Sequence, residues 1–262
     1  MTDRLKGKVA LITGGASGLG ANAAELMVRE GARVVVADIA ADRGQAIAAK
    51  LGASGHFTKL DVTSEDNWKA VIAETVAKFG ALHVLLNSAG IGLSKTVEEI
   101  ELAEWRKVHA IDLDGVFLGC KHGVAEIKKH TKSLGGSIIN MSSQMGHVGG
   151  PTRTVYCATK HAMEGFSKAM AIELAPHNIR VNTISPGGIV TGIFAKSAGV
   201  ADPAAADRAA STMPLWGALT IAGLVGGGML GFAAGMNDLL DQRRDQARPR
   251  RDVHDGEEAR VD

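Results

Sequence analysis

The fold is decided by the stretch Thr13-Gly14-Gly15-Ala16-Ser17-Gly18-Leu19-Gly20, which lies between a strand-like run, Val9 to Thr13, and a helix-like segment, Ala21 to Glu30. Glycines let the backbone turn tightly and approach a pyrophosphate closely, and the N-terminus of the next helix offers free N–H groups to the anion. Such glycines alone are a weak signal, because any tight strand-to-helix turn can use them. Here the strand and the helix supply the context that a phosphate-binding turn requires.

Short runs rich in valine, isoleucine and leucine recur between longer amphipathic stretches. This rhythm predicts a parallel sheet with helical crossovers, because buried parallel strands read as continuous apolar runs. We therefore predict a single α/β domain, a doubly wound parallel sheet of the Rossmann type. A strand is also expected before Asp61, followed by a helix from Ser64 to Phe79 with Thr63 or Ser64 as its N-cap. The apolar strand runs are Val9 to Thr13, Arg33 to Ala37, His83 to Asn87, Ser137 to Met141 and Ile179 to Ile184.

Charge and cysteine content narrow the range of partners. The chain of 262 residues has 29 basic and 28 acidic residues and a formal net charge of +1. We expect no nucleic-acid partner and no attraction to an acidic membrane surface, so the partners should be small molecules or copies of the chain. Cys120 and Cys157 lie far apart, which favours a reducing, cytoplasmic location over a disulfide framework. The first residues mix charges and run straight into a strand, so we expect no signal peptide.

The cofactor preference is predicted from Asp38, which ends the second strand-like run. An acidic side chain at this place accepts hydrogen bonds from the adenosine ribose. The alternative, a solvated residue at the end of a strand, ranks lower because the glycine-rich turn lies upstream at the right distance. A carboxylate there repels the extra phosphate of NADP, and neither Ser17 nor Ile39 offers a compensating positive charge. The sequence therefore predicts NAD.

Tyr156 is the only tyrosine in the chain and lies four residues before Lys160. This spacing puts the phenol and the ammonium group on one helical face, one turn apart. A free phenol has a pKa of about 10, which is too high for a good base near neutrality. A nearby lysine and an oxidised nicotinamide ring both favour the phenolate. Taken alone, the pair is more often structural than functional, so its meaning depends on the motifs around it.

Several motifs follow one another in an order that resembles the short-chain dehydrogenase/reductase family. The resemblance extends from about Lys8 to about Phe194. It implies a Rossmann-like fold and an NAD-dependent alcohol dehydrogenase or ketone reductase. The motifs are TGGASGLG from Thr13, DV at Asp61 and Val62, NSAG from Asn87 to Gly90, Ser143, Tyr156-xxx-Lys160, and PGGIVT from Pro186 to Thr191.

The resemblance also implies a role for each motif. In that family the serine hydrogen-bonds the substrate oxygen, the tyrosine exchanges the proton, and the lysine holds the nicotinamide ribose and lowers the pKa of the tyrosine. These roles fall on Ser143, Tyr156 and Lys160; Ser142 competes for the serine role, but its spacing to the tyrosine fits less well. Asp61 and Val62 are expected at the adenine, Asn87, Ala89 and Gly90 beside the dinucleotide, and Ile189 and Thr191 at the carboxamide. The residues expected to bind the cofactor are Gly14, Ser17, Gly18, Leu19, Gly20, Asp38, Ile39, Asp61, Val62, Asn87, Ala89, Gly90, Tyr156, Lys160, Pro186, Gly187, Ile189 and Thr191.

One position departs from the family pattern. Where members usually carry an asparagine, this chain has Asp112. The family's asparagine shapes a helix kink and anchors a water chain to the lysine, largely through its backbone, so we expect Asp112 to serve in the catalytic set. The added negative charge should hold the proton of Lys160 more firmly.

The substrate is expected to be small and largely apolar, such as a cyclic alcohol or a steroid. This expectation rests on Met145, Val148, Phe194 and Trp216 as candidates for the pocket wall, although ordinary core packing explains them equally well. None of the nine histidines forms an HExxH pair, so no metal is assigned, and no GxSxG elbow points to acyl transfer. The rival hypothesis is a non-catalytic dinucleotide-binding scaffold or sensor with an altered C-terminus. The presence of both Tyr156 and Lys160 favours the enzyme.

The family resemblance fails near the end of the chain. We expect residues 1–212 to form the dinucleotide-binding and catalytic domain, 213–240 an atypical glycine-rich apolar segment, and 241–262 a charged, disordered tail. The usual closing strand and its turn cannot be found after Trp216. We expect a homodimer or a homotetramer, weakened if the closing strand is absent. A membrane span within the uncharged stretch Pro214 to Met236 is disfavoured, because glycine and alanine supply little transfer energy.

Overall fold

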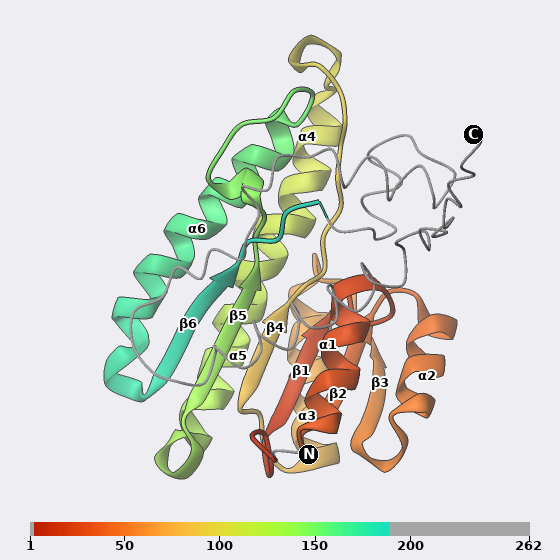
Figure 1. Cartoon of the computed structure of the whole chain (residues 1–262), viewed down its shortest axis with the longest axis vertical. Helices are drawn as coiled ribbons and strands as arrows, with labels where there is room; N and C mark the ends of the chain where they lie inside the picture. Colours follow the sequence, from red (N-terminus) through yellow and green to blue (C-terminus); the bar gives the residue numbers. More distant parts are fainter. Residues whose placement is uncertain (1–2, 189–262) are drawn as a thin grey trace, which may run out of the picture. The chain divides into compact units, whose positions relative to one another are not determined.

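The structure, a computed structural model, describes residues 3–188, apart from the side chains of residues 131–134. These residues form a parallel six-stranded sheet in the order β3-β2-β1-β4-β5-β6, with helices on both faces (Figure 1). The predicted Rossmann-like α/β fold is confirmed. The strands are β1 (Val9–Thr13), β2 (Arg33–Asp38), β3 (Gly55–Lys59), β4 (Val84–Asn87), β5 (Gly136–Met141) and β6 (Ile179–Ile184).

Strand β3, at one edge of the sheet, is the strand whose bounds the apolar runs did not predict. Its sequence, GHFTK, is only partly buried and pairs with β2 alone, in the register Val34↔Gly55 to Asp38↔Lys59. An edge strand has one neighbour and a more exposed surface, so it needs no continuous apolar run. By contrast β1, which lies between β2 and β4, is buried at all five positions.

The two crossover helices whose bounds were predicted begin and end within three residues of those positions. The first begins at Gly18, inside the glycine-rich stretch, so Gly18, Leu19 and Gly20 form its first turn. The helices are α1 (Gly18–Arg29), α2 (Ala41–Lys50), α3 (Glu65–Phe79), α4 (Leu102–His109), α5 (Gly115–Leu134) and α6 (Thr154–Leu174). Short 3-10 turns occupy η1 (Gly52–Ser54), η2 (Val97–Glu99), η4 (Gln144–Gly146) and η5 (Ala175–His177), and η3 (Ala110–Asp114) is a π-helical turn between α4 and α5.

A buried tryptophan of α3 holds the turn after β3 in place. Trp68 of α3 is fully buried, and its indole Nε1–H donates to the carbonyl oxygen of Val62 at 2.9 Å. Gly119 of α5 lets the ring approach, since a Cβ there would lie 2.6 Å from the indole. A larger residue would push the two helices apart.

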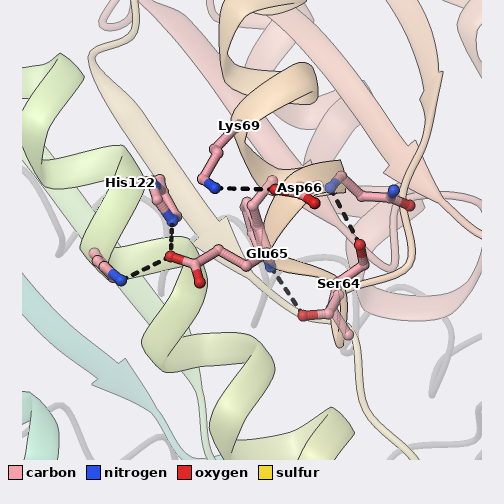
Figure 2. A network of polar contacts seen from close by, with 9 residues as sticks. Ser64, Glu65, Asp66, Lys69 and His122 are labelled. Atoms are coloured by element: carbon pink, nitrogen blue, oxygen red, sulfur yellow. Dashed lines mark hydrogen bonds and ion pairs between the residues drawn. The ribbon is translucent and has the colours of Figure 1, made fainter.

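A polar network joins α3 to α5 on the surface near the same turn (Figure 2). The Ser64 hydroxyl accepts from the Asn67 N–H at 3.2 Å, so Ser64 is the N-cap of α3, one of the two predicted caps. Glu65 accepts from Lys121 Nζ at 2.7 Å and lies 2.9 Å from His122 Nε2, both on α5 (Figure 2). These hydrogen bonds lower the pKa of Glu65 from 4.5 to about 2.

The predictions for the C-terminal part of the chain concern residues outside the described range. They are the missing closing strand, the glycine-rich segment 213–240 and the charged tail 241–262. Within the described part of the chain, no helix combines the length and the apolar character needed to span a bilayer.

The low pKa of Glu65 predicts a pH-dependent contribution to stability. Because the folded pKa lies below the unfolded value of 4.5, the carboxylate stabilises the fold above that value and loses its effect as the pH falls toward about 2. We expect Glu65→Gln to lower the urea midpoint of unfolding at about pH 7 and to lower it clearly less at about pH 3.5. Glu98→Gln, at an exposed position of η2, is the control. An equal difference from wild type at both pH values would contradict the prediction.

Candidate functional site

The predicted site residues gather at the carboxyl edge of the sheet, where open α/β folds bind their ligands. A cavity of about 700 Å³ lies there, within the usual size range of ligand pockets. It is bounded by the glycine-rich turn, the ends of the central strands and the first half of α6. The predicted residues that line it are Gly14, Ser17, Gly18, Leu19, Gly20, Asp38, Ile39, Asp61, Val62, Ala89, Gly90, Asp112, Ser143, Met145, Tyr156, Lys160, Pro186 and Gly187.

The glycine-rich turn forms a cradle that side chains would fill. Gly14 has φ +65, and a Cβ on it would lie 2.9 Å from the backbone of Ala89. A Cβ on Gly20 would collide with the carbonyl oxygen of Gly14. Both positions therefore require glycine, for backbone conformation in one case and close approach in the other. The cradle fits the pyrophosphate of a dinucleotide, which must approach the backbone closely.

Thr13 fixes this cradle to the next strand. Its buried hydroxyl accepts from the N–H groups of Ser88 and Ala89, each at 3.0 Å. The ends of β1 and β4 are thereby joined beside the cavity. Sequence reasoning did not assign this role to Thr13, although a hydroxyl residue at a strand end just before the glycines was a signal for it.

Asp38 is held in a defined position at the other end of the cradle. Its Oδ2 accepts from the Ala16 N–H at 3.0 Å and its Oδ1 from the Ala40 N–H at 2.9 Å. A carboxylate has about four acceptor sites, so acceptor capacity remains for two ribose hydroxyls. Arg43, a residue not predicted from the sequence, lines the same cavity and brings a positive charge to it.

Tyr156 and Lys160 lie on the cavity side of α6, as the four-residue spacing predicts. The Lys160 ammonium nitrogen lies 5.4 Å from the centre of the Tyr156 ring and donates to the carbonyl oxygen of Met141 at 3.0 Å. Its side chain is only 5% exposed.

The two candidate serines differ in their surroundings. Ser143 follows β5 and is the N-cap of η4, where its hydroxyl accepts from the Met145 N–H at 3.2 Å. The Ser142 hydroxyl instead donates to the backbone carbonyl of Lys160 at 3.5 Å. Both serines line the cavity, and the bond to Lys160 turns the Ser142 hydroxyl toward the helix backbone.

Asp112 lies in the π-helical turn η3 and is fully buried against Lys160. Its Oδ1 accepts from the Ile91 N–H at 2.8 Å, and its Oδ2 lies 3.4 Å from the Lys160 ammonium nitrogen. Burial raises the pKa of Asp112, and the charge of Lys160 offsets part of this rise. Burial also lowers the pKa of Lys160, but Asp112 and Tyr156 outweigh it, so the net shift of the lysine is upward. The side chain, and not only the backbone, of Asp112 therefore faces the lysine.

Some predicted residues lie elsewhere. Asn87 is buried behind the cavity wall, where its amide nitrogen donates to Asn140 Oδ1 at 2.9 Å. Val148 is 53% exposed. Ile189, Thr191, Phe194 and Trp216 lie outside the described residues.

Comparison with known proteins places the chain among oxidoreductases. Residues 8–199 match the family model described as short chain dehydrogenase. The chain is 42% identical over 204 residues to trans-4-hydroxycyclohexanecarboxylate dehydrogenase of Sinomonas cyclohexanicum, covering 74% of this chain and 77% of the relative. It is 45% identical over 191 residues to 3-alpha-(or 20-beta)-hydroxysteroid dehydrogenase of Mycobacterium tuberculosis (73% and 72%). It is 44% identical over 195 residues to NADP-dependent (R)-specific alcohol dehydrogenase of Lentilactobacillus kefiri (73% and 77%).

The contact between Asp112 and Lys160 predicts the effect of removing one charge. We expect Asp112→Asn to lower the pKa of Lys160, because the lysine loses the carboxylate that stabilises its protonated form. The lysine would then deprotonate at lower pH and shift the alkaline limb of any activity that needs its charge in the same direction. The pKa is measured from the 13Cε resonance of Lys160 in labelled protein. Asp114→Asn, at an exposed position of the same turn, is the control; an unchanged lysine pKa in Asp112→Asn would refute the pairing.

Proposed function

The chain belongs to the short chain dehydrogenase family, and we propose that it transfers a hydride between NAD(H) and the carbinol or carbonyl carbon of a small, largely apolar secondary alcohol or ketone. The observation that carries this proposal is the convergence of Ser143, Tyr156 and Lys160 on one cavity that also contains the glycine cradle. A protein that only binds a dinucleotide has no need of this second cluster.

The substrate class follows from the relatives and from the cavity wall. The names of two relatives give a hydroxycyclohexane carboxylate and a hydroxysteroid, both of which are hydroxylated ring compounds. Met145 lines the cavity beside Ser143, and a flexible thioether packs well against an aliphatic ring. We therefore propose a cyclic secondary alcohol or the matching ketone.

The chain's own residues supply the proton chemistry. The bound cofactor supplies or accepts the hydride. In the direction of oxidation, the Ser143 hydroxyl donates a hydrogen bond to the substrate oxygen, and the Tyr156 phenolate takes the hydroxyl proton. The Lys160 ammonium, held by Asp112 and the Met141 carbonyl, stabilises that phenolate. In the direction of reduction, the Tyr156 phenol returns the proton to the substrate oxygen.

We propose NAD rather than NADP as the preferred cofactor. The support is Asp38, whose carboxylate two backbone N–H groups hold at the cofactor end of the cavity. An additional phosphate there would meet a fixed negative charge. Arg43 is the opposing influence, since its guanidinium could pair with that phosphate, and one relative is named as NADP-dependent.

The cytoplasmic location and the homodimer or homotetramer stay predictions from the sequence. The location is supported by two free cysteines, Cys120 and Cys157. The assembly state is best measured by analytical ultracentrifugation of the full chain.

Turnover of Tyr156→Phe tests the catalytic assignment. The purified protein is assayed for NADH production with a panel of cyclic secondary alcohols. We expect Tyr156→Phe to bind NADH with nearly unchanged affinity and to lose a factor of about a hundred or more in kcat, because a positioned proton acceptor is removed. Ser143→Ala should also lower kcat. Near wild-type turnover in Tyr156→Phe would rule out this mechanism, and a wild-type protein that oxidises no alcohol with either cofactor would overturn the proposed function.

Fluorescence titration with both reduced cofactors tests the cofactor assignment. We expect the wild-type protein to bind NADH about tenfold or more tightly than NADPH, and Asp38→Ala to narrow this difference, because the fixed carboxylate is lost. Arg43→Ala should weaken NADPH binding and leave NADH binding nearly unchanged. Equal dissociation constants for the two cofactors in the wild-type protein would contradict the assignment of NAD.

A further inference from the structure

Glu164 is a buried carboxylate to which the proposed mechanism gives no role. It lies on α6 four residues after Lys160, so Tyr156, Lys160 and Glu164 follow one another at one-turn intervals on the buried side of the helix. Glu164 is only 4% exposed. A carboxylate at this depth requires polar partners, because burial without them destabilises the fold.

The partners of Glu164 come from two different segments. Oε2 accepts from the Thr183 hydroxyl and Oε1 from the Ser185 hydroxyl, each at 2.9 Å. Oε1 also lies 3.4 Å from Nε2 of His147, which follows η4 directly. The same His147 nitrogen lies 3.2 Å from the Ser185 oxygen. One carboxylate therefore joins α6, the end of β6 and the end of η4.

This arrangement is not a serine hydrolase relay. Such a relay needs one imidazole nitrogen facing the serine and the other facing the acid. Here Nε2 of His147 faces both Ser185 and Glu164, and the Ser185 hydroxyl donates directly to the carboxylate. Nor does any group of three metal-ligating side chains occur within residues 3–188. The contacts of Glu164 therefore connect α6, the end of β6 and the end of η4.

Of the two segments, η4 depends more on Glu164. The sheet already fixes β6, through its ladder to β5 and the Ser142 N–H bond to the Ile184 carbonyl at 2.8 Å. The η4 turn belongs to no ladder. Its start is held by the Gln144 N–H bond to the Pro186 carbonyl at 2.9 Å, and its end by His147 Nε2, which lies 3.2 Å from the Ser185 oxygen and 3.4 Å from Glu164 Oε1.

Close packing gives η4 a defined position on α6. A Cβ on Gly146 would lie 3.0 Å from the Lys160 carbonyl oxygen and 3.2 Å from Cγ of Glu164. Gly146 therefore lets the turn lie directly over the helix at the positions of the lysine and the glutamate. Ser143 is the N-cap of this turn, so its distance from Tyr156 depends on how firmly η4 is held.

We propose that Glu164 is a positioning residue that holds η4 on α6 through His147, and thereby keeps the Ser143 hydroxyl at the distance from Tyr156 that one substrate oxygen requires. The inference rests on the proposed function for its effect on turnover, but the holding of η4 does not. A displacement of about 1 Å in a catalytic group can cost up to about a hundredfold in rate. Glu164→Gln keeps the size of the side chain and removes its charge.

The first experiment measures η4 directly and needs no substrate. Hydrogen–deuterium exchange is followed in the full chain for wild type, Glu164→Gln and the control Glu173→Gln, an exposed position of the same helix. We expect faster exchange over residues 144–148 in Glu164→Gln alone, with exchange over 179–184 unchanged. Unchanged exchange over 144–148 would overturn the proposal whatever the activity.

The second experiment is a double-mutant cycle on kcat with a cyclic alcohol. We expect Glu164→Gln to lower kcat about tenfold in the wild-type background and less than about twofold in Ser143→Ala, because the serine it positions is already gone. The Kd for NADH should stay within about twofold. An equal loss in both backgrounds would show that Glu164 does not act through Ser143. Faster η4 exchange in a protein that oxidises no alcohol would overturn the proposed function and leave the structural role standing.

His147→Ala is the second variant, for the case in which Glu164→Gln does not fold. One third of the His147 side chain is exposed, so this change should be tolerated. It removes the imidazole nitrogen that contacts Glu164 and Ser185, while the two hydroxyl bonds to Glu164 remain. We expect the same faster exchange over residues 144–148 and the same loss of kcat, and normal exchange of η4 in folded His147→Ala would refute the proposal.

Discussion

The site depends on one buried positive charge, the Lys160 ammonium group. Burial alone would favour loss of its proton, so the fold must supply compensating negative charge and acceptors. It does so from two elements: the carboxylate of Asp112 in η3 and the Met141 carbonyl at the end of β5. The π-helical turn between α4 and α5 brings this carboxylate to the lysine. An asparagine at position 112 would supply a dipole, whereas the aspartate supplies a full charge.

Side chains at the strand ends fix the glycine-rich side of the cavity. Thr13 joins β1 to the segment after β4, and Asp38 joins the end of β2 to the glycine-rich turn through the Ala16 N–H. Each bond uses a side chain at a strand end to fix a neighbouring loop. Positioned groups of this kind spare a ligand part of the ordering cost of binding. The strand ends at the carboxyl edge of the sheet therefore set the distances between the walls of the cavity.

Most of the fold could be predicted from the sequence because its central strands are buried on both faces. That burial forces continuous apolar runs, and the run in β1 predicted both ends of that strand correctly. Strand β3 was expected only from the turn that follows it, since an edge strand with one partner can be polar and short. The sequence motifs likewise predicted most of the residues that line the cavity, but they could not show that the Asn87 side chain turns into the core.

The sequence by itself determined the residue types at each strand end and the one-turn spacing of Tyr156 and Lys160, because local periodicity fixes which residues share a helix face. Only the tertiary structure decided which distant groups meet them. Asp112 lies 48 positions before Lys160 in the chain and within 3.4 Å of it in space, and Glu164 finds its partners on β6 and beside η4. Such pairings arise where helix, sheet and turn pack together, and a contact set by packing leaves no periodic trace in the chain.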